Sequence, residues 1–197
     1  MKKVMILAVM MVATLTASAQ QAVGTWSVTP KVGLNLATIR DGGIDAKMKV
    51  GLVAGADLTY QIAQPFALSV GAFYSMQGAK GKDREFGVSY DAKLNLDYIN
   101  IPIMANVYIV RGLAIKAGIQ PGFNVKHKMK VEGAGQSYEQ TIEGFKSFDF
   151  TIPLGLSYEI SDFVIDARYN LGLTKLVEDT SGKNSVIQFT LGYKIPL

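Results

Sequence analysis

Apolar and polar residues alternate along residues 94–124, in two runs separated only by Arg111 and Gly112. From position 99 the apolar residues occupy every second place, and the alternation resumes after the turn at Leu113. A period of two is that of a β-strand, because successive side chains point to opposite faces. The two apolar sets are Ile99, Ile101, Ile103, Ala105, Val107 and Ile109, and then Leu113, Ile115, Ala117, Ile119, Phe123 and Val125. The stretch therefore predicts two strands joined by a tight turn.

The opposite face of these two strands is polar, with Asn106, Lys116, Gln120 and Asn124 among its residues. A soluble barrel would turn its apolar face inward and leave the polar face in water. Here the candidate inner face consists of glycines, amides and charges, so the apolar face must contact another apolar medium. A transmembrane β-strand needs about 9–11 residues with apolar side chains outside and polar side chains inside. We therefore predict that both strands cross a lipid bilayer.

Six further runs alternate in the same way, at residues 26–38, 50–61, 66–77, 148–160, 163–174 and 187–195. The connections between the runs are alternately long and short. Lipid cannot satisfy the backbone groups of a free sheet edge, so the strands must close into a ring. The pattern predicts an all-β fold, an eight-stranded antiparallel up-and-down transmembrane β-barrel. Long connections are typical of the external side, which places both termini in the periplasm.

Local features modify this regular pattern. Proline removes a ladder donor, so we expect bulges at Pro102 and Pro153. The alternation slips near Tyr98, since Leu94 and Leu96 belong to the opposite phase, and this predicts a bulge or an extension above the bilayer. Residues 78–92 and 126–144 are expected to be long polar connections. A periplasmic aromatic girdle is expected to contain Trp26, Tyr60, Phe66, Tyr108, Tyr158, Phe163 and Tyr193.

The N-terminus has the pattern of a cleaved export signal. Lys2 and Lys3 precede an apolar run at 4–15, and small residues at 17–19 form a cleavage site. We predict a signal peptide at 1–19 and a barrel domain at 20–197. Elsewhere no apolar run reaches the roughly 18 residues of a membrane helix. Cysteine is absent, which excludes a lipoprotein anchor and disulfides.

The charge balance is only weak evidence for a polyanionic partner. Of 20 basic residues two lie in the signal, which leaves 18 against 16 acidic residues, or +2, and gives no reason to expect nucleic acid as a partner. Seven charged residues fall on the inward phase: Lys31, Asp57, Lys116, Glu159, Asp166, Arg168 and Lys194. Unpaired charge is costly in a narrow lumen, so the mixed signs predict an ion-pair network. Eight strands leave an interior just wide enough for side chains, which disfavours a pore.

Lys126, Lys128 and Lys130 flank the single histidine, His127. At the external rim these lysines would lie beside the phosphates of lipopolysaccharide, although a soluble loop explains them equally well. His127 with Ser137, Glu139 and Glu132 would suit a lipid-modifying enzyme, but no spacing fixes them together, and a solvated histidine is favoured. The acidic set Glu132, Glu139, Glu143 and Asp149 is too widely spaced for a calcium loop. We therefore expect no catalytic, metal or cofactor site.

Three segments resemble the PorT-like outer-membrane β-barrel family, which includes small proteins labelled porins: YINIPI at 98–103, AGIQPGF at 117–123 and DARYNLGL at 166–173. The resemblance covers nearly all of the mature chain and implies an outer-membrane location. The end, TLGYKIPL at 190–197, is similar to the signal by which the barrel-assembly machinery recognises its clients, except that it ends on Leu197 rather than an aromatic residue. Outer-membrane lipid, lipopolysaccharide and that machinery are the implied partners, and no protein partner is implied.

The leading hypothesis is a non-enzymatic outer-membrane barrel with a structural, surface-interaction or assembly role carried by its extracellular loops. A small-solute porin is the alternative, and a lipid-modifying enzyme is the third hypothesis. Conductance in planar bilayers separates the first two. The composition of lipid A in cells that overproduce the protein tests the third.

Overall fold

The computed structural model describes residues 22–41, 47–85, 88–133, 136–141, 144–177 and 181–197. The predicted signal peptide and Glu143 lie outside these ranges. Within them no helix is long and apolar enough to cross a membrane.

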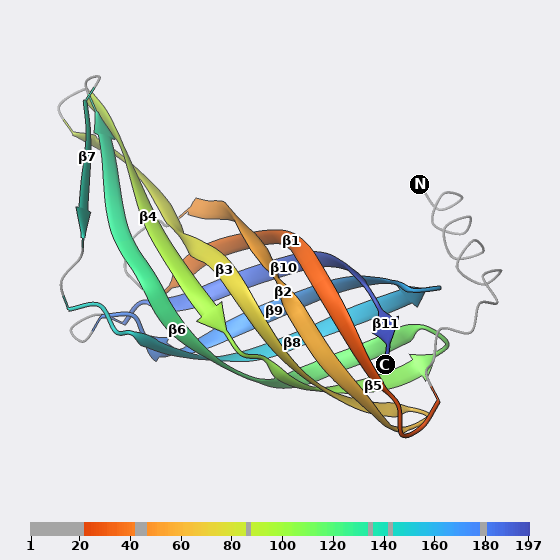
Figure 1. The fold of residues 1–197 in the computed structure, drawn as a ribbon. Helices are drawn as coiled ribbons and strands as arrows, with labels where there is room; N and C mark the ends of the chain where they lie inside the picture. Colours follow the sequence, from red (N-terminus) through yellow and green to blue (C-terminus); the bar gives the residue numbers. More distant parts are fainter. Residues whose placement is uncertain (1–21, 42–46, 86–87, 134–135, 142–143, 178–180) are drawn as a thin grey trace.

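A closed antiparallel sheet forms the body of the molecule (Figure 1). Its ring runs through eight strands and closes where the first pairs with the last. Two of the strands, β4 and β5, continue each other and count as one, because both pair with β3 on one side and with β6 on the other. The predicted fold class is therefore confirmed. The elements are β1 (Trp26–Arg40), β2 (Lys47–Ala63), β3 (Phe66–Glu85), β4 (Val88–Asn100), β5 (Ile103–Val110), β6 (Leu113–Gly133), β7 (Gln136–Thr141), β8 (Phe148–Ile160), β9 (Phe163–Lys175), β10 (Lys183–Tyr193) and β11 (Ile195–Pro196).

Apolar side chains lie outside the barrel wall and polar side chains inside. On β1, Val32 is 59% exposed and Leu34 47%, whereas Lys31 is 6% exposed and Asn35 is fully buried. This is the reverse of a soluble protein and matches the apolar outer band of a transmembrane barrel. The alternation in the sequence therefore assigned the correct face to these residues.

One of the predicted irregularities is present and two are not. A register shift opposite β6 lies between Asp97 and Tyr98. The bulge expected at Pro102 is absent: strand pairing is interrupted there, between β4 and β5, but the register with β3 and with β6 is the same on both sides of the interruption. The bulge expected at Pro153 is absent, because β8 is continuous and its register with β6 and β9 is unshifted there. The β6–β8 ladder pairs at Leu154 and Thr151 but omits the two residues between them. A gap in the ladder thus accommodates the missing amide donor without a bulge.

One side of the barrel extends well beyond the rest, at the upper left of Figure 1. This arm consists of the outer parts of β3, β4 and β6, together with β7, which pairs with β6. We predicted polar connections at 78–92 and 126–144. This was wrong, because most of both segments is strand. Their sequence lacks the alternation of apolar outward and polar inward residues that identified the other strands.

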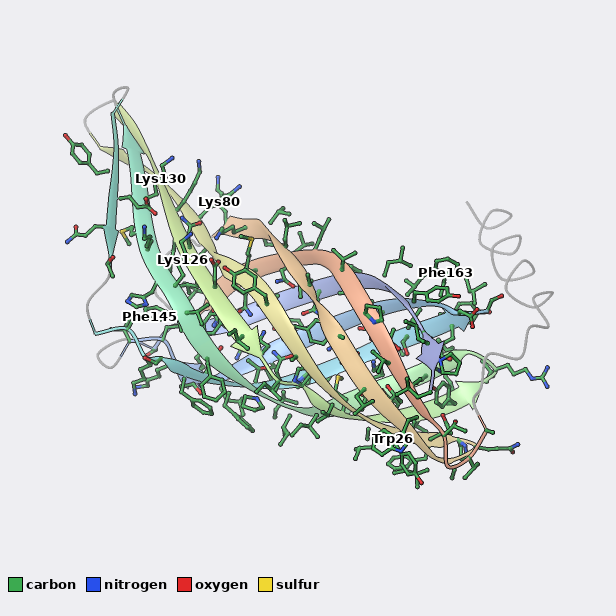
Figure 2. The ribbon with its side chains drawn as sticks, in the orientation of Figure 1. Trp26, Lys80, Lys126, Lys130, Phe145 and Phe163 are labelled. Atoms are coloured by element: carbon green, nitrogen blue, oxygen red, sulfur yellow. The ribbon has the colours of Figure 1, made fainter. Side chains whose placement is uncertain are left out.

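The opposite end of the barrel carries an aromatic girdle. The ring centroids of Trp26 and Tyr60 are 4.7 Å apart and those of Phe163 and Tyr193 are 5.4 Å apart. Figure 2 labels Trp26 and Phe163 at the end where β11 also lies. Tyr108 was wrongly assigned to the girdle. It is 7% exposed and points into the lumen. The odd-numbered residues of β5 face outward, so the even-numbered Tyr108 must face inward.

Candidate functional site

Asp166 is the centre of an ion-pair cluster inside the barrel. Strand β9 places Asp166 and Arg168 two residues apart and therefore on one face. Arg168 donates from Nε to Asp166 Oδ1 at 2.8 Å and from Nη2 to Oδ2 at 3.1 Å. Lys116 and Lys31 also donate to Oδ2, at 2.8 and 3.2 Å. A single carboxylate thus accepts bonds from three cations.

A second carboxylate completes this central cluster. Lys31 Nζ lies 2.7 Å from Asp57 Oδ2, and Arg168 Nη2 lies 3.8 Å from the same oxygen. The five residues come from β1, β2, β6 and β9, and their side chains are at most 6% exposed. The guanidinium carbon of Arg168 also lies 5.7 Å from the ring centroid of Phe73. Paired and bonded charges are tolerated in such an interior, while removal of one partner leaves a buried charge uncompensated.

Glu159 belongs to a separate ion pair. It accepts bonds from Lys194 at 2.6 Å and from the Tyr108 hydroxyl at 2.8 Å. The sequence predicted one network of seven charges, whereas the structure separates Glu159 and Lys194 from the cluster around Asp166 and Arg168. The backbone of Lys194 donates to the Asp162 carbonyl at 2.7 Å, which brings the lysine beside the end of β8. Lys194 is therefore the cation that reaches Glu159.

A small polar cavity lies between the two groups of charges. Lys31, Asp57 and Lys116 line one part of it, and Glu159 and Lys194 another. Its volume is ≈ 20 Å³. A space of that size holds about one water molecule. The charged side chains therefore fill the lumen at this level.

Further polar contacts continue across the lumen toward the arm. Asn35 donates to Ser75 Oγ at 2.9 Å, and Gln120 donates to Thr151 Oγ1 at 3.0 Å. Beyond these, Asn184 donates to Asp149 Oδ2 at 2.7 Å. Gln120 and Thr151 lie on adjacent strands, and each of the other two contacts spans one intervening strand, so the inward side chains link neighbouring parts of the wall.

Apolar side chains pack together at the arm end of the lumen, a feature absent from the sequence predictions. We call this group the mouth cluster; its buried members are Leu96, Tyr98 and Leu176, against which Ile39, Leu94, Phe145 and Val177 pack. The His127 ring stacks on Phe145 with centroids 5.7 Å apart and an interplanar angle of 4°. The phase slip at Leu94 and Leu96 was the sequence signal of this cluster.

Of the candidate catalytic set, the structure describes only the side chains of His127 and Glu139, and each of these contacts a different partner. His127 Nδ1 is 2.9 Å from Asn124 Oδ1, while Glu139 pairs with Lys128 at 3.3 Å. The side chains of Ser137 and Glu132 lie outside the described part of the structure. Over the described ranges, no three histidine, cysteine or acidic side chains are grouped so that they could hold a metal ion.

The three lysines beside His127 lie on the arm. Lys126 Nζ is 3.9 Å from Asp97 Oδ2, and its side chain is 45% exposed. Lys128 pairs with Glu139, as above, and Lys130 lies opposite Lys93 in the β4–β6 register. Figure 2 shows Lys126 and Lys130 on the arm, with Lys80 of β3 nearby. The structure thus adds basic residues that the sequence reasoning had not connected with them.

A comparison with known families settles the class of protein. The profile of the outer membrane protein beta-barrel domain family matches residues 18–178. The chain belongs to this family. Membership of the barrel-domain family agrees with the closed sheet and the apolar outer band, and it makes the protein a small outer-membrane β-barrel. No curated protein matches the chain.

Solved structures support the fold of this family member. The attachment invasion locus protein Ail of Yersinia pestis has a TM-score of 0.50 and 18% sequence identity, over 88% of this chain and 100% of its own. Neisserial surface protein A has a TM-score of 0.52 and 13% identity, over 86% of this chain and 97% of its own. At such identities the likeness concerns the fold alone.

Proposed function

We propose that the protein is a closed, non-enzymatic outer-membrane barrel that conducts no solute and acts at the cell surface through its arm. The observation that carries this proposal is the double obstruction of the lumen. Ion pairs centred on Asp166 fill it at one level, and the mouth cluster around Leu96 fills it at another. A solute would have to displace both groups to pass.

The finer features of the proposal follow from the sequence. Residues 1–19 are removed as a signal peptide, both termini face the periplasm, and the barrel-assembly machinery inserts the chain through its last strand. The arm then projects outside the cell, where it carries a structural, surface-interaction or assembly role. The resemblance to PorT-like barrels is part of this proposal, without transfer of any relative's secretion or gliding role.

Conductance of the purified protein in planar bilayers tests the closed lumen. We expect no unitary steps from the wild-type protein, nor from a control variant, Asp162→Ala, at an exposed turn. Regular steps from the wild type, with an amplitude that grows in Arg168→Ala, would show a hydrated pathway past the ion pairs and would replace this proposal by a pore.

Protease added to whole cells tests the orientation. Lys128 and Lys130 in the arm should be accessible to trypsin, whereas Arg111 in the opposite turn should be protected. Cleavage after Arg111 with the arm intact would require the inverted topology.

A further inference from the structure

Four lysines form one row across four neighbouring strands. The register pairs Lys47 of β2 with Lys80 of β3, Lys80 with Lys93 of β4, and Lys93 with Lys130 of β6. Directly opposed side chains have Cβ atoms about 4.5–5.5 Å apart, and like charges in such positions repel. We call these four residues the lysine row. Lys130 has Glu139 opposite it on β7, so the repulsion is greatest at the other end of the row, between Lys47 and Lys80, where an anion would relieve it.

The lysine row lies on the outer face of the wall. The pair next to Lys80 and Lys93 in the register is Ala79 and Leu94. Ala79 is buried and Leu94 packs in the mouth cluster, so this pair points inward. Neighbouring residues of a strand point to opposite faces, which turns Lys80 and Lys93 outward. Lys47 and Lys130 lie on the same face, because residues that are directly paired across neighbouring strands point to the same side of the sheet.

The row begins just beyond the lipid-facing band. On β3 the half-exposed Tyr74 lies below Lys80, and on β6 the exposed Val125 directly precedes Lys126. On the same face, Asp97 accepts a bond from the Tyr74 hydroxyl at 2.8 Å and lies 3.9 Å from Lys126 Nζ. Polar and charged groups thus replace apolar ones on three adjacent strands. If the bilayer covers the apolar band, its headgroups lie at this depth.

Among the side chains that the structure describes, carboxylates compensate only part of the positive charge on this face. Lys126 and Lys128 each have an acidic neighbour, Asp97 and Glu139. In the ranges that the structure covers, neither Lys47 nor Lys80 forms an ion pair with a carboxylate. Both are exposed at the edge of the row nearest the barrel body. The remaining positive charge therefore calls for an external anion.

We propose that the lysine row binds the phosphate groups of a phosphorylated glycolipid in the outer leaflet, with Lys47 and Lys80 as the principal contacts. Strands tilt in a barrel, so an in-register row rises around the wall and offers ammonium groups at more than one depth. That arrangement suits a headgroup with several phosphates, such as lipid A. The proposal rests on the proposed orientation of the arm, and it extends the lipopolysaccharide contact expected for Lys126, Lys128 and Lys130 to a site on four strands.

Native mass spectrometry of the detergent-solubilised protein measures this binding. The probes are bisphosphorylated lipid A, its phosphate-free form, and inorganic pyrophosphate as a soluble anion. A lysine near an anionic lipid surface contributes about 1 kcal/mol, so each Lys→Gln change should weaken lipid A binding about fivefold. We expect this loss in Lys47→Gln and Lys80→Gln, and no loss in Arg111→Gln, the matched control at the opposite end. Equal binding of the phosphate-free form, or an equal loss in the control, would overturn the proposal.

Thermal unfolding distinguishes a lipid site from a structural role of the same lysines. In phosphatidylcholine vesicles Lys80→Gln should unfold at the same or a higher temperature than the wild type, because one repulsive charge is gone. When lipid A is added, the wild type should gain more stability than the variant, because the variant binds it about fivefold more weakly, and the difference between the two should shift in favour of the wild type. If pyrophosphate produces the same gain as lipid A, the site takes soluble anions and the lipid proposal is wrong. Because lipid A and detergent replace the cell here, a wrong orientation or a conducting lumen would leave these results unchanged.

Discussion

The membrane-spanning wall and the arm above it follow opposite rules of burial. In the wall Ile99 lies outside and Asn100 lies in the lumen. A few residues earlier on the same strand Leu96 is buried inside, and Asp97 lies on the outer side, where Tyr74 and Lys126 cover it so that it is only 3% exposed. The position at which the rule changes is Tyr98. The position along β4 at which the apolar residues change from the outer face to the inner face therefore marks the boundary of the lipid.

Two other strands change in the same way. On β3 Ser75 is buried below the change, and above it Ala79 points inward while Lys80 points outward. After β9, Leu176 enters the mouth cluster next to the exposed Lys175. The hydrophobic effect acts only where water is the alternative. The arm has water on its outer side and buries apolar residues inside, whereas the wall has lipid outside and leaves its polar residues to the lumen.

The largest effect is expected from Asp166→Ala in the wall. The variant leaves Lys31, Lys116 and Arg168 with a single carboxylate, Asp57, and breaking a buried pair costs about 3–5 kcal/mol. Arg168→Ala should cost less, because it leaves two cations with two carboxylates. Unfolding by urea in lipid vesicles gives both values. Equal stability of Asp166→Ala and the wild type would show that water, and not the ion pairs, fills the lumen.

Partial recovery in a double variant would identify the source of this penalty. Replacing Asp166 and Arg168 together by Ala removes charges of both signs. If uncompensated charge causes the loss of stability, the double variant should lose less free energy of unfolding than the two single variants lose together. Strict additivity would contradict that explanation.

A lysine in place of an outward residue should affect the wall and the arm differently. Leu34→Lys places a charge in the lipid band, which costs about 2–4 kcal/mol near the bilayer centre. Asn95→Lys, on the outer face of the arm and opposite Lys128, should cost only about 0.2–1 kcal/mol, from repulsion between the two lysines. The same vesicle titration compares them. Similar costs at both positions would mean that lipid also covers the arm.

Leu96→Ala tests the mouth cluster. Leu96 is fully buried, and a buried Leu→Ala change costs about 2–5 kcal/mol. We expect a value near the lower end of that range, because the cluster lies at the open end of the barrel where neighbours can relax. Val110→Ala, at an exposed position near the other end, is the control. A loss no greater than that of the control would show that the cluster does not hold the arm to the barrel.

The smallest effect is expected at the boundary itself. Tyr74→Phe removes the hydroxyl that donates to Asp97 and should cost about 1 kcal/mol, the usual net value of one hydrogen bond. If the Tyr74→Phe change has no effect in an Asp97→Asn background, the bond accounts for the cost. An undiminished effect in that background would attribute the cost to packing.

The sequence was sufficient for whatever depends on alternation alone. The eight strands and the inward position of residues such as Asp166 follow from a period of two, which lipid imposes on every spanning strand. Above Tyr98 no lipid imposes that period, so the arm strands and β7 could not be recognised as strands.

The same reasoning could not predict which residues far apart in the sequence contact each other. Which carboxylate Lys194 meets depends on how the chain returns beside Asp162, and the lysine row depends on the register of β2, β3, β4 and β6. A shift of one residue in any pairing would turn a lysine to the other face. The change of alternation at Leu94 and Leu96 was visible in the sequence. That these residues form a buried cluster could be seen only in the folded barrel.

A scan of single spin-labelled cysteines along β3 and β4 tests most directly that the rule of burial changes at the lipid boundary. The chain contains no cysteine, so each label is unique. Oxygen reports contact with lipid and a water-soluble nickel complex reports contact with water. We expect labels at Val70 and Ile99 to favour oxygen, and labels at Lys80 and Asn95 to favour nickel, with the change between Tyr74 and Lys80 on β3. Labels at Lys80 and Asn95 that contact oxygen as strongly as the label at Ile99 would place the arm in lipid and contradict this interpretation.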